Sequence, residues 1–261
     1  MATEGSRFVW RELMTGDVAR AVQFYTRLFG WKTEVMDMGT MKYTIVKNGD
    51  KQVGGIYQTP PEARGTPPNW LGYVSVDNVD GACEKAVKLG AKIMMPPMDI
   101  PNVGRWAVLT DPQGAAVAPF RGNQAPQPTP TRAQPGEFCW DELMTNDVAG
   151  AVKFYTQLFG WAAVEHDMGA HGKYTLFKKQ GTEKDQNVPG LGGAMAMPKD
   201  AKHPPYWMHY IEHADVDKGA AMARELGGQM FVPPTDIPNI GRFSVFADPT
   251  GAHFALYKNA H

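Results

Sequence analysis

The segment FVWRELMT at residues 8–15 decides the fold, because it returns almost unchanged as FCWDELMT at residues 138–145. The stretch LFGW at 28–31 returns at 158–161, and DIPN at 99–102 returns at 236–239. The offset between the copies grows from 130 to 137 positions, and nearly all of the increase falls near residues 179–190. A repeat this long indicates a duplicated domain, since solenoid repeats have periods of roughly 20–50 residues.

Composition indicates a soluble two-domain protein. The 261 residues suffice for two domains of about 100–150 residues, each with its own core. The net charge is −1 and both signs are interspersed, so we expect neither nucleic acid nor a membrane as a partner. The N-terminal residues lack the apolar segment of a signal peptide. Cys83 and Cys139 are typical of buried thiols in a reducing compartment, so we predict a cytoplasmic location.

A proline-rich stretch separates the two copies. Residues 122–136 hold four prolines and show no apolar periodicity, which is typical of a semi-extended spacer. We therefore predict a first domain at 1–121, a linker at 122–136 and a second domain at 137–261. This linker is long enough for the second domain to cross to the opposite side of the first.

Each copy divides again into two similar modules. Thr15 and Asp17 are candidate caps for a helix that reaches Phe29 and is stopped by Gly30. Further helices are expected at 79–89 and 216–226, each followed by glycine. The strands expected in the first copy are 8–14, 33–38, 42–47, 53–57, 73–76, 92–95, 106–110 and 115–120. This order predicts an α+β fold of four βαβββ modules.

A family resemblance rests on two segments of the first copy. GDVARAVQFYTRLFGW at 16–31 and TDPQGAAV at 110–117 resemble the vicinal oxygen chelate superfamily, which includes glyoxalase I, extradiol dioxygenases and bleomycin-resistance proteins. The whole chain is similar to tandem glyoxalase-like antigens of actinobacteria that carry a hydroxylase label. The resemblance covers residues 8–121 and 138–257. It implies two tandem glyoxalase-like domains with cupped mixed sheets, and it leaves the reaction open because this fold hosts many chemistries.

The resemblance also implies a metal held by two His or Gln and two Glu side chains on the concave side of the sheets. Carried over residue by residue, these four positions fall on Trp10 and Trp140, Gly55 and Gly193, Leu71 and Met208, and Ala118 and Ala255. None of these side chains can ligate a divalent cation. All seven histidines lie at residue 166 or beyond, so the first domain has none. We therefore expect no metal and no cofactor.

Aromatic side chains are expected to fill the space of the ligands. Because side chains alternate along a strand, the carried-over positions predict which residues face inward. The predicted ligand-binding residues are Trp10, Tyr57, Tyr73 and Trp106 in the first domain and Trp140, Tyr210 and Phe243 in the second. A cavity with flat apolar walls suits a small organic molecule. The alternative is that Trp10 and Trp140 merely plug a former metal site.

Glu12 and Glu142 are the candidate catalytic residues. A carboxylate against aromatic faces is poorly solvated, which raises its pKa toward the range of a general base. It could instead attract a cationic or hydroxylated ligand. Two structural alternatives remain: Glu12 pairs with Lys42 or Arg105, or it is an ordinary solvent-facing strand residue.

Arg105 and Arg242 follow the repeated DIPN motif. Their guanidinium groups could clamp a carboxylate or phenolate of a ligand in bidentate fashion. The alternative, which we favour, is that each arginine braces its own loop through Asp99 or Asp236. The turns that begin at Asp111 and Asp248 are interpreted as turn chemistry without a catalytic role.

These observations leave two hypotheses of different class. In the first, the chain is a metal-independent protein that binds an aromatic or polar organic molecule, and its two domains form an intramolecular pseudo-dimer in place of a homodimer. In the second, it is an enzyme of the same superfamily, a glyoxalase-type lyase, an isomerase or a hydroxylase, that uses Glu12 or Glu142 as acid and base. The sequence leaves open which hypothesis holds, the identity of the ligand, whether both sites work and whether chains associate further.

Overall fold

The computed structural model describes residues 5–39, 41–124, 132–168, 172–198, 200–201 and 203–260. The centre of the predicted linker, residues 125–131, lies outside the described residues. Within the described ranges, no helix is long and apolar enough to cross a membrane.

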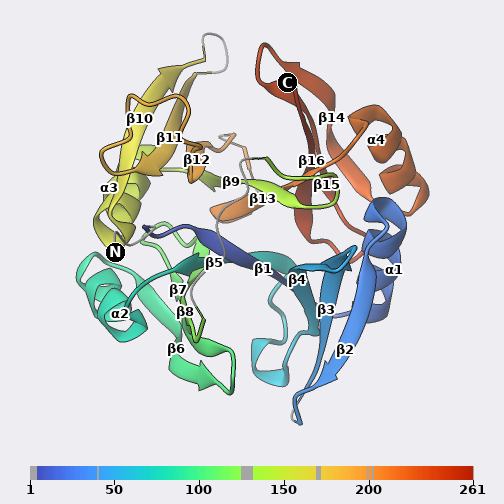
Figure 1. The fold of residues 1–261 in the computed structure, drawn as a ribbon, viewed down its shortest axis with the longest axis horizontal. Helices are drawn as coiled ribbons and strands as arrows, with labels where there is room; N and C mark the ends of the chain where they lie inside the picture. The colour runs from blue at the N-terminus through green and yellow to red at the C-terminus, as the bar shows by residue number, and fades with distance from the viewer. Residues whose placement is uncertain are drawn as a thin grey trace. The chain divides into compact units, whose positions relative to one another are not determined.

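The first half of the chain forms two modules in the predicted order of strand, helix and three strands (Figure 1). The elements of the first module are β1 (Phe8–Thr15), α1 (Val18–Phe29), β2 (Lys32–Asp37), β3 (Lys42–Asn48) and β4 (Lys51–Gln58). A 3-10 turn at Pro61–Ala63 leads to the second module, which consists of β5 (Asn69–Ser75), α2 (Val79–Lys88), β6 (Lys92–Ile100), β7 (Gly104–Thr110) and β8 (Ala116–Gly122).

The second half repeats this order. Its third module consists of β9 (Phe138–Thr145), α3 (Val148–Phe159), β10 (Trp161–Asp167), β11 (Lys173–Lys179) and β12 (Gly192–Ala196). Its fourth consists of β13 (Tyr206–Glu212), α4 (Val216–Glu225), β14 (Gln229–Ile237), β15 (Gly241–Ala247) and β16 (His253–Asn259). The predicted α+β fold of four βαβββ modules is therefore confirmed.

The strands form two eight-stranded mixed sheets, one for each half of the chain. Their strand orders are β2-β3-β4-β1-β5-β8-β7-β6 and β10-β11-β12-β9-β13-β16-β15-β14. Within each module the first strand pairs in parallel with the last, as β1 does with β4 and β13 with β16. The last three strands of each module pair in sequence as antiparallel neighbours, as β2 does with β3 and β15 with β16, and β1 with β5 and β9 with β13 join the modules.

Local sequence sets the ends of the helices. The Asp17 carboxylate accepts from the backbone N–H of Arg20 at 3.0 Å, which caps α1. Gly30 ends α1 with φ of 70°, in the left-handed region that glycine adopts without steric cost. Asp147 and Gly160 perform the same roles for α3. Of the two candidate caps, Asp17 is the one that caps α1, the predicted stop at Gly30 is confirmed, and the second copy repeats both features.

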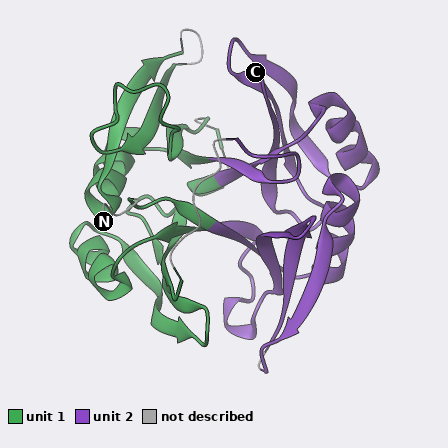
Figure 2. Cartoon of the chain, viewed as in Figure 1, with its two compact units in different colours: residues 1–9, 72–131, 141–207 green, residues 10–71, 132–140, 208–261 purple. Residues whose placement is uncertain are grey.

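The chain divides into two compact units, and each contains modules from both halves of the sequence (Figure 2). Unit 1 comprises residues 1–9, 72–131 and 141–207, so it holds most of the second and third modules. Unit 2 comprises residues 10–71, 132–140 and 208–261, so it holds most of the first and fourth modules. Within unit 1, α2 packs against α3, and within unit 2, α1 packs against α4.

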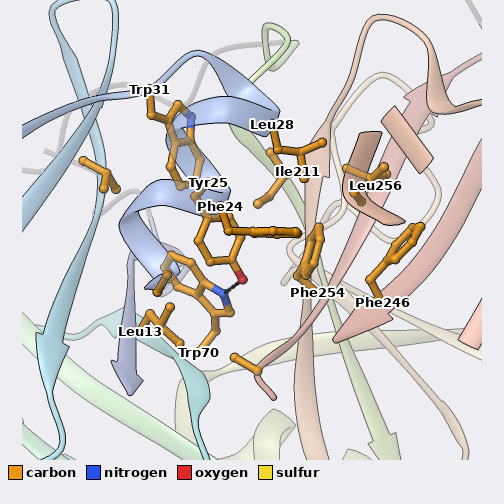
Figure 3. Close-up of a cluster of buried hydrophobic side chains, with 14 of the residues drawn as sticks. Leu13, Phe24, Tyr25, Leu28, Trp31, Trp70, Ile211, Phe246, Phe254 and Leu256 are labelled. Carbon is orange, nitrogen blue, oxygen red and sulfur yellow. Dashed lines mark hydrogen bonds between the residues drawn. The ribbon is translucent and has the colours of Figure 1, made fainter. Parts of the chain in front are cut away.

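The core of unit 2 is built around α1 and the fourth module (Figure 3). Phe24 and Tyr25 of α1 place their ring centroids 5.7 and 5.5 Å from that of Phe254 in β16. Ile211 and Leu256, from β13 and β16, are fully buried in the same cluster. Unit 1 has the matching core, in which Phe154 and Tyr155 of α3 pack among side chains of the second and third modules.

A buried chain of hydrogen bonds joins the two modules of unit 1. The indole Nε1 of Trp207 donates to the hydroxyl of Tyr155 at 2.9 Å, and this hydroxyl donates to Oδ2 of Asp111 at 3.1 Å. The other oxygen of Asp111 accepts from the backbone N–H groups of residues 113–115 at 2.7–2.9 Å. Burial, and then the charge of Asp111, raises the pKa of Tyr155. Asp111 therefore forms its turn, as predicted, and also holds a helix of the other sequence half.

Unit 2 contains a looser copy of this chain. Trp70 donates to the Tyr25 hydroxyl at 2.9 Å, as the dashed line in Figure 3 marks. Asp248 again accepts from its own turn, at the N–H groups of residues 250–252. Burial first, and the charge of Asp248 second, raises the pKa of Tyr25. The Oδ2 atom of Asp248 meets no partner with normal hydrogen-bond geometry within the described residues.

We expect Tyr155→Phe to lower the free energy of unfolding by about 2–4 kcal/mol, because Trp207 Nε1 and Asp111 Oδ2 would both lose their partner while buried. The matched Tyr25→Phe change leaves only Trp70 Nε1 newly unpaired, so it should cost about 1–2 kcal/mol. Urea unfolding of both variants measures the difference. Equal losses of unfolding free energy in the two variants would contradict the stronger hydrogen-bond link through Tyr155 in unit 1.

Candidate functional site

Strand alternation places Glu12 on the face opposite the core. Leu13 of β1 is fully buried in the core of unit 2, so Trp10 and Glu12 point to the other face. In the parallel register of β1 and β4, Glu12 lies beside Gly55. Glu12 is only 8% exposed, so it is not an ordinary solvent-facing residue.

Glu12 ends a short chain of hydrogen bonds in unit 2. Tyr43 of β3 donates its hydroxyl proton to Oε2 of Glu12 at 2.7 Å. The same hydroxyl accepts from the indole Nε1 of Trp10 at 2.9 Å. Tyr57 of β4 stacks on Tyr43, with ring centroids 6.3 Å apart and planes at 22°. Trp10, Glu12 and Tyr57, all predicted from the sequence, are therefore brought together, and Tyr43 connects them.

The Tyr43 hydroxyl occupies the space that a side chain at position 55 would need. A Cβ added to Gly55 would overlap both the hydroxyl oxygen and the Cζ atom of Tyr43. Gly55 is one of the positions onto which the resemblance carries a metal ligand. The phenol ring of Tyr43, hydrogen-bonded to Trp10 and Glu12, thus fills the space beside Gly55 in which the resemblance places a metal ligand. Burial first, and the charge of Glu12 second, raises the pKa of both Tyr43 and Tyr57.

Unit 1 holds the equivalent cluster around Glu142. Gly193 of β12 lies beside Glu142 in the parallel register with β9, and a Cβ at Gly193 would overlap the hydroxyl of Tyr174. Glu142 is also 8% exposed. Tyr206 of β13 lies near it, since burial and then the charge of Glu142 raise the pKa of Tyr206. Trp140, on the same strand as Glu142, is half-buried and belongs to unit 2.

Three further aromatic side chains pack together in each unit, and we call each group of three a shelf. In unit 1, Tyr73 stacks on Trp106 with centroids 5.7 Å apart and planes at 21°, and Phe120 meets Tyr73 edge-on at 6.0 Å. In unit 2, Tyr210 lies 6.5 Å from Phe243, and Tyr257 meets Tyr210 edge-on at 6.3 Å.

Each shelf borders a carried-over ligand position. Tyr73 lies beside Ala118 in the register of β5 and β8, and Tyr210 lies beside Ala255 in that of β13 and β16. The tyrosines of the two shelves therefore occupy the surroundings in which the resemblance places the last metal ligand.

The two arginines hold their own loops. The guanidinium of Arg105 binds both oxygens of Asp80 at 2.7 Å and Asp99 at 3.1 Å. Arg242 binds Asp217 at 2.8–2.9 Å and Asp236 at 2.8 Å in the same way. This is the bracing arrangement that we favoured from the sequence, extended by an aspartate from the neighbouring helix. It places both guanidinium groups among aspartates and not beside the glutamate clusters.

Two open hollows lie away from the glutamate clusters and the aromatic shelves, and Arg242 lines the second of them. One, of about 720 Å³, is lined by Gly181, Glu183, Lys184 and Asp185. The other, of about 320 Å³, is lined by residues 236–239, 241–242 and 258–260. Neither hollow includes a glutamate or an aromatic residue of the clusters and shelves.

Tyr43 and Tyr174 are the site residues that sequence reasoning missed. A signal was present, since KYT at 42–44 returns at 173–175 and the glycine pair at 54–55 returns at 192–193. A paired tyrosine and glycine on neighbouring strands suggests that a ring covers a missing side chain.

The chain belongs to the Glyoxalase/Bleomycin resistance protein/Dioxygenase superfamily, whose family model matches residues 7–118 and 139–256. The two matched ranges correspond to the two copies of the repeat. The predicted superfamily, and two tandem glyoxalase-like domains, are therefore confirmed.

Two kinds of curated relative span nearly the whole chain. The protein named "Putative glyoxylase CFP32" from Mycobacterium tuberculosis is 35% identical over 254 residues, which cover 96% of this chain and 94% of that protein. The anthracycline biosynthesis protein DnrV from Streptomyces peucetius is 31% identical over 262 residues, which cover 95% and 92%.

Solved structures share the fold. The LapB dioxygenase from Pseudomonas sp. KL28 superposes with a TM-score of 0.66 at 12% identity, covering all of this chain and 94% of that one. A Mn(II)-bound glyoxalase from Novosphingobium aromaticivorans gives 0.64 at 15% identity, covering 98% and 84%. At this identity the likeness concerns the fold alone.

The residues of this chain do not fit a metal at the positions onto which the family resemblance carries its ligands. Trp10, Leu71 and Ala118 offer no ligand atom, and the space beside Gly55 is filled by the Tyr43 hydroxyl. Among the described residues, no group of three His, Cys, Asp or Glu side chains could hold a metal ion.

We expect Gly55→Ala to destabilise the protein by about 1–3 kcal/mol, because the added methyl group displaces the Tyr43 ring. Adding Tyr43→Ala should relieve this clash, so the two changes should be less than additive in urea unfolding. Gly16→Ala is the matched control, since its Cβ meets nothing within 4 Å. Strictly additive changes in the free energy of unfolding would contradict the close contact between Tyr43 and Gly55.

Proposed function

We propose that this protein binds a flat aromatic organic molecule, with or without polar groups, and that no metal takes part. The observation that carries this proposal is the Tyr43 hydroxyl over Gly55, hydrogen-bonded between Trp10 and Glu12. Gly55 is one of the positions onto which the family resemblance carries a metal ligand. Here a protein hydroxyl fills the space beside it, and the side chains around it are aromatic.

The chemistry around each glutamate suits such a ligand. Aromatic faces supply apolar contact area, and a single buried carboxylate selects a group that donates a hydrogen bond or carries positive charge. Glu12 with Tyr43 and Tyr57 forms one such set, and Glu142 with Tyr174 and Tyr206 forms the other. A relative named for anthracycline biosynthesis supports a polycyclic aromatic ligand for this chain.

We further propose that the two sequence domains form an intramolecular pseudo-dimer. The composition of the units supports this, because each unit combines one module of the first domain with one of the second. The cytoplasm remains our proposed location, which is supported by Cys83 and Cys139, neither of which forms a disulfide.

An enzyme of the same superfamily is the second candidate. The observation that favours it is the buried carboxylate of Glu12, held by a tyrosine hydroxyl as a general base often is. The same applies to Glu142, and a relative that bears a glyoxylase name points the same way. In this case Glu12 or Glu142 would accept and return a substrate proton.

Titration of the tryptophan fluorescence with naphthalene, naphthol and naphthylmethylammonium tests the binding proposal. Naphthol or the ammonium probe should bind about tenfold more tightly than naphthalene, because only these two can donate to a carboxylate. A chelator should leave all three affinities unchanged. In the Glu12→Gln, Glu142→Gln double variant, the ratio of the affinity for the ammonium probe or naphthol to that for naphthalene should fall toward one.

The control is Glu34→Gln, which removes an exposed strand carboxylate that pairs with Lys47 and should leave the preference intact. Binding that the chelator abolishes, or no binding of any probe, would overturn the proposal. Conversion of a bound molecule, with a bell-shaped pH profile that Glu12→Gln removes, would establish the enzyme instead.

A further inference from the structure

Trp106 carries a buried hydrogen-bond donor that the protein leaves unused. Its indole Nε1 is inaccessible to solvent, and no acceptor reaches it from any residue in the described ranges. A buried donor without a partner costs about 1–3 kcal/mol, so folded proteins rarely retain one. Three other indole groups have hydroxyl acceptors: Trp10 donates to Tyr43, Trp70 to Tyr25 and Trp207 to Tyr155.

The surroundings of Trp106 in unit 1 are apolar and flat. Its ring stacks on Tyr73, and in the registers of β7 it lies between Phe120 of β8 and Met98 of β6. Met98 is 45% exposed and unbranched, so its side chain can move at low cost. A flat molecule that displaces this side chain would lie against the shelf with the Nε1 proton at its edge.

The repeat provides an internal comparison. Phe243 stands in unit 2 where Trp106 stands in unit 1, and Tyr257 stands in place of Phe120. Phe243 has no N–H group, and the hydroxyl of Tyr257 already donates to the carbonyl of Ile240 at 2.9 Å. The unused donor is therefore specific to one copy, while the shape of the shelf is shared.

We propose that Trp106 is a specificity residue whose indole N–H recognises the carbonyl oxygen of a planar aryl ketone or quinone bound against Trp106 and Phe120. This inference rests on the proposed function, and it adds the chemical class of the ligand. It also makes the two copies unequal, because Phe243 cannot offer this hydrogen bond. A ligand carbonyl would satisfy the donor, and the ligand rings would contact the half-buried aromatic side chains of Trp106 and Phe120.

Fluorenone and fluorene test the proposal, because these planar molecules differ only in the ketone. Calorimetric titration of the full chain should show fluorenone bound about tenfold more tightly, the effect of one added hydrogen bond. In Trp106→Phe this ratio should fall to about one. Trp31→Phe is the matched control, because that indole already donates to the Gly136 carbonyl at 2.8 Å, and it should keep the ratio.

A second measurement covers the case in which Trp106→Phe does not fold. In protein labelled with heavy nitrogen at tryptophan, fluorenone should move one indole N–H resonance downfield in the NMR spectrum, and fluorene should not. If both molecules bind equally, or if no indole proton responds to the ketone, the role of Trp106 is overturned while aromatic binding stands. If neither molecule binds and the naphthalene probes also fail, the proposed function fails as well.

Discussion

The buried hydroxyl of a helical tyrosine ties the two modules of unit 1 together. Tyr155 accepts from Trp207 and donates to Asp111, so a helix of the third module is tied to a turn of the second. The bond lies in a fully buried core, where the loss of either partner leaves a polar atom without water. In unit 2, Tyr25 accepts from Trp70, and the charge of Asp248 lies close enough to raise its pKa. The link between modules from opposite sequence halves supports the proposed pseudo-dimer.

The helices pack against one face of the strands, and the candidate site lies on the other face. Leu13 enters the core, and its neighbour Glu12 is therefore turned toward Tyr43. On that face, aromatic rings and one carboxylate surround the positions onto which the family resemblance carries metal ligands. These residues depend on one another, since the ring of Tyr43 requires glycine at position 55, and this ring in turn links Trp10 to Glu12. The same set of residue types recurs around Glu142.

The local features of the fold could be predicted from the sequence. Asp17 and Gly30 mark the ends of α1 because capping depends on a few neighbouring residues, and strand alternation identified the face of Glu12. Long-range partners could not be predicted in this way. Tyr43 meets Gly55 only through the register of β3 and β4, and Arg105 meets Asp80 only when α2 has packed on its sheet. The division into units was equally hidden, because it depends on which modules pack together and not on where the chain repeats.

The measurement that tests this account most directly is the metal content of the purified protein, determined by mass spectrometry after mild dialysis and expressed per chain. The account predicts a ratio near zero for zinc, nickel, iron and manganese, because the ligand positions hold Trp10, Gly55, Leu71 and Ala118. A ratio of about one or two ions per chain would contradict it, since a chelating site would then exist that the aromatic network leaves no room for.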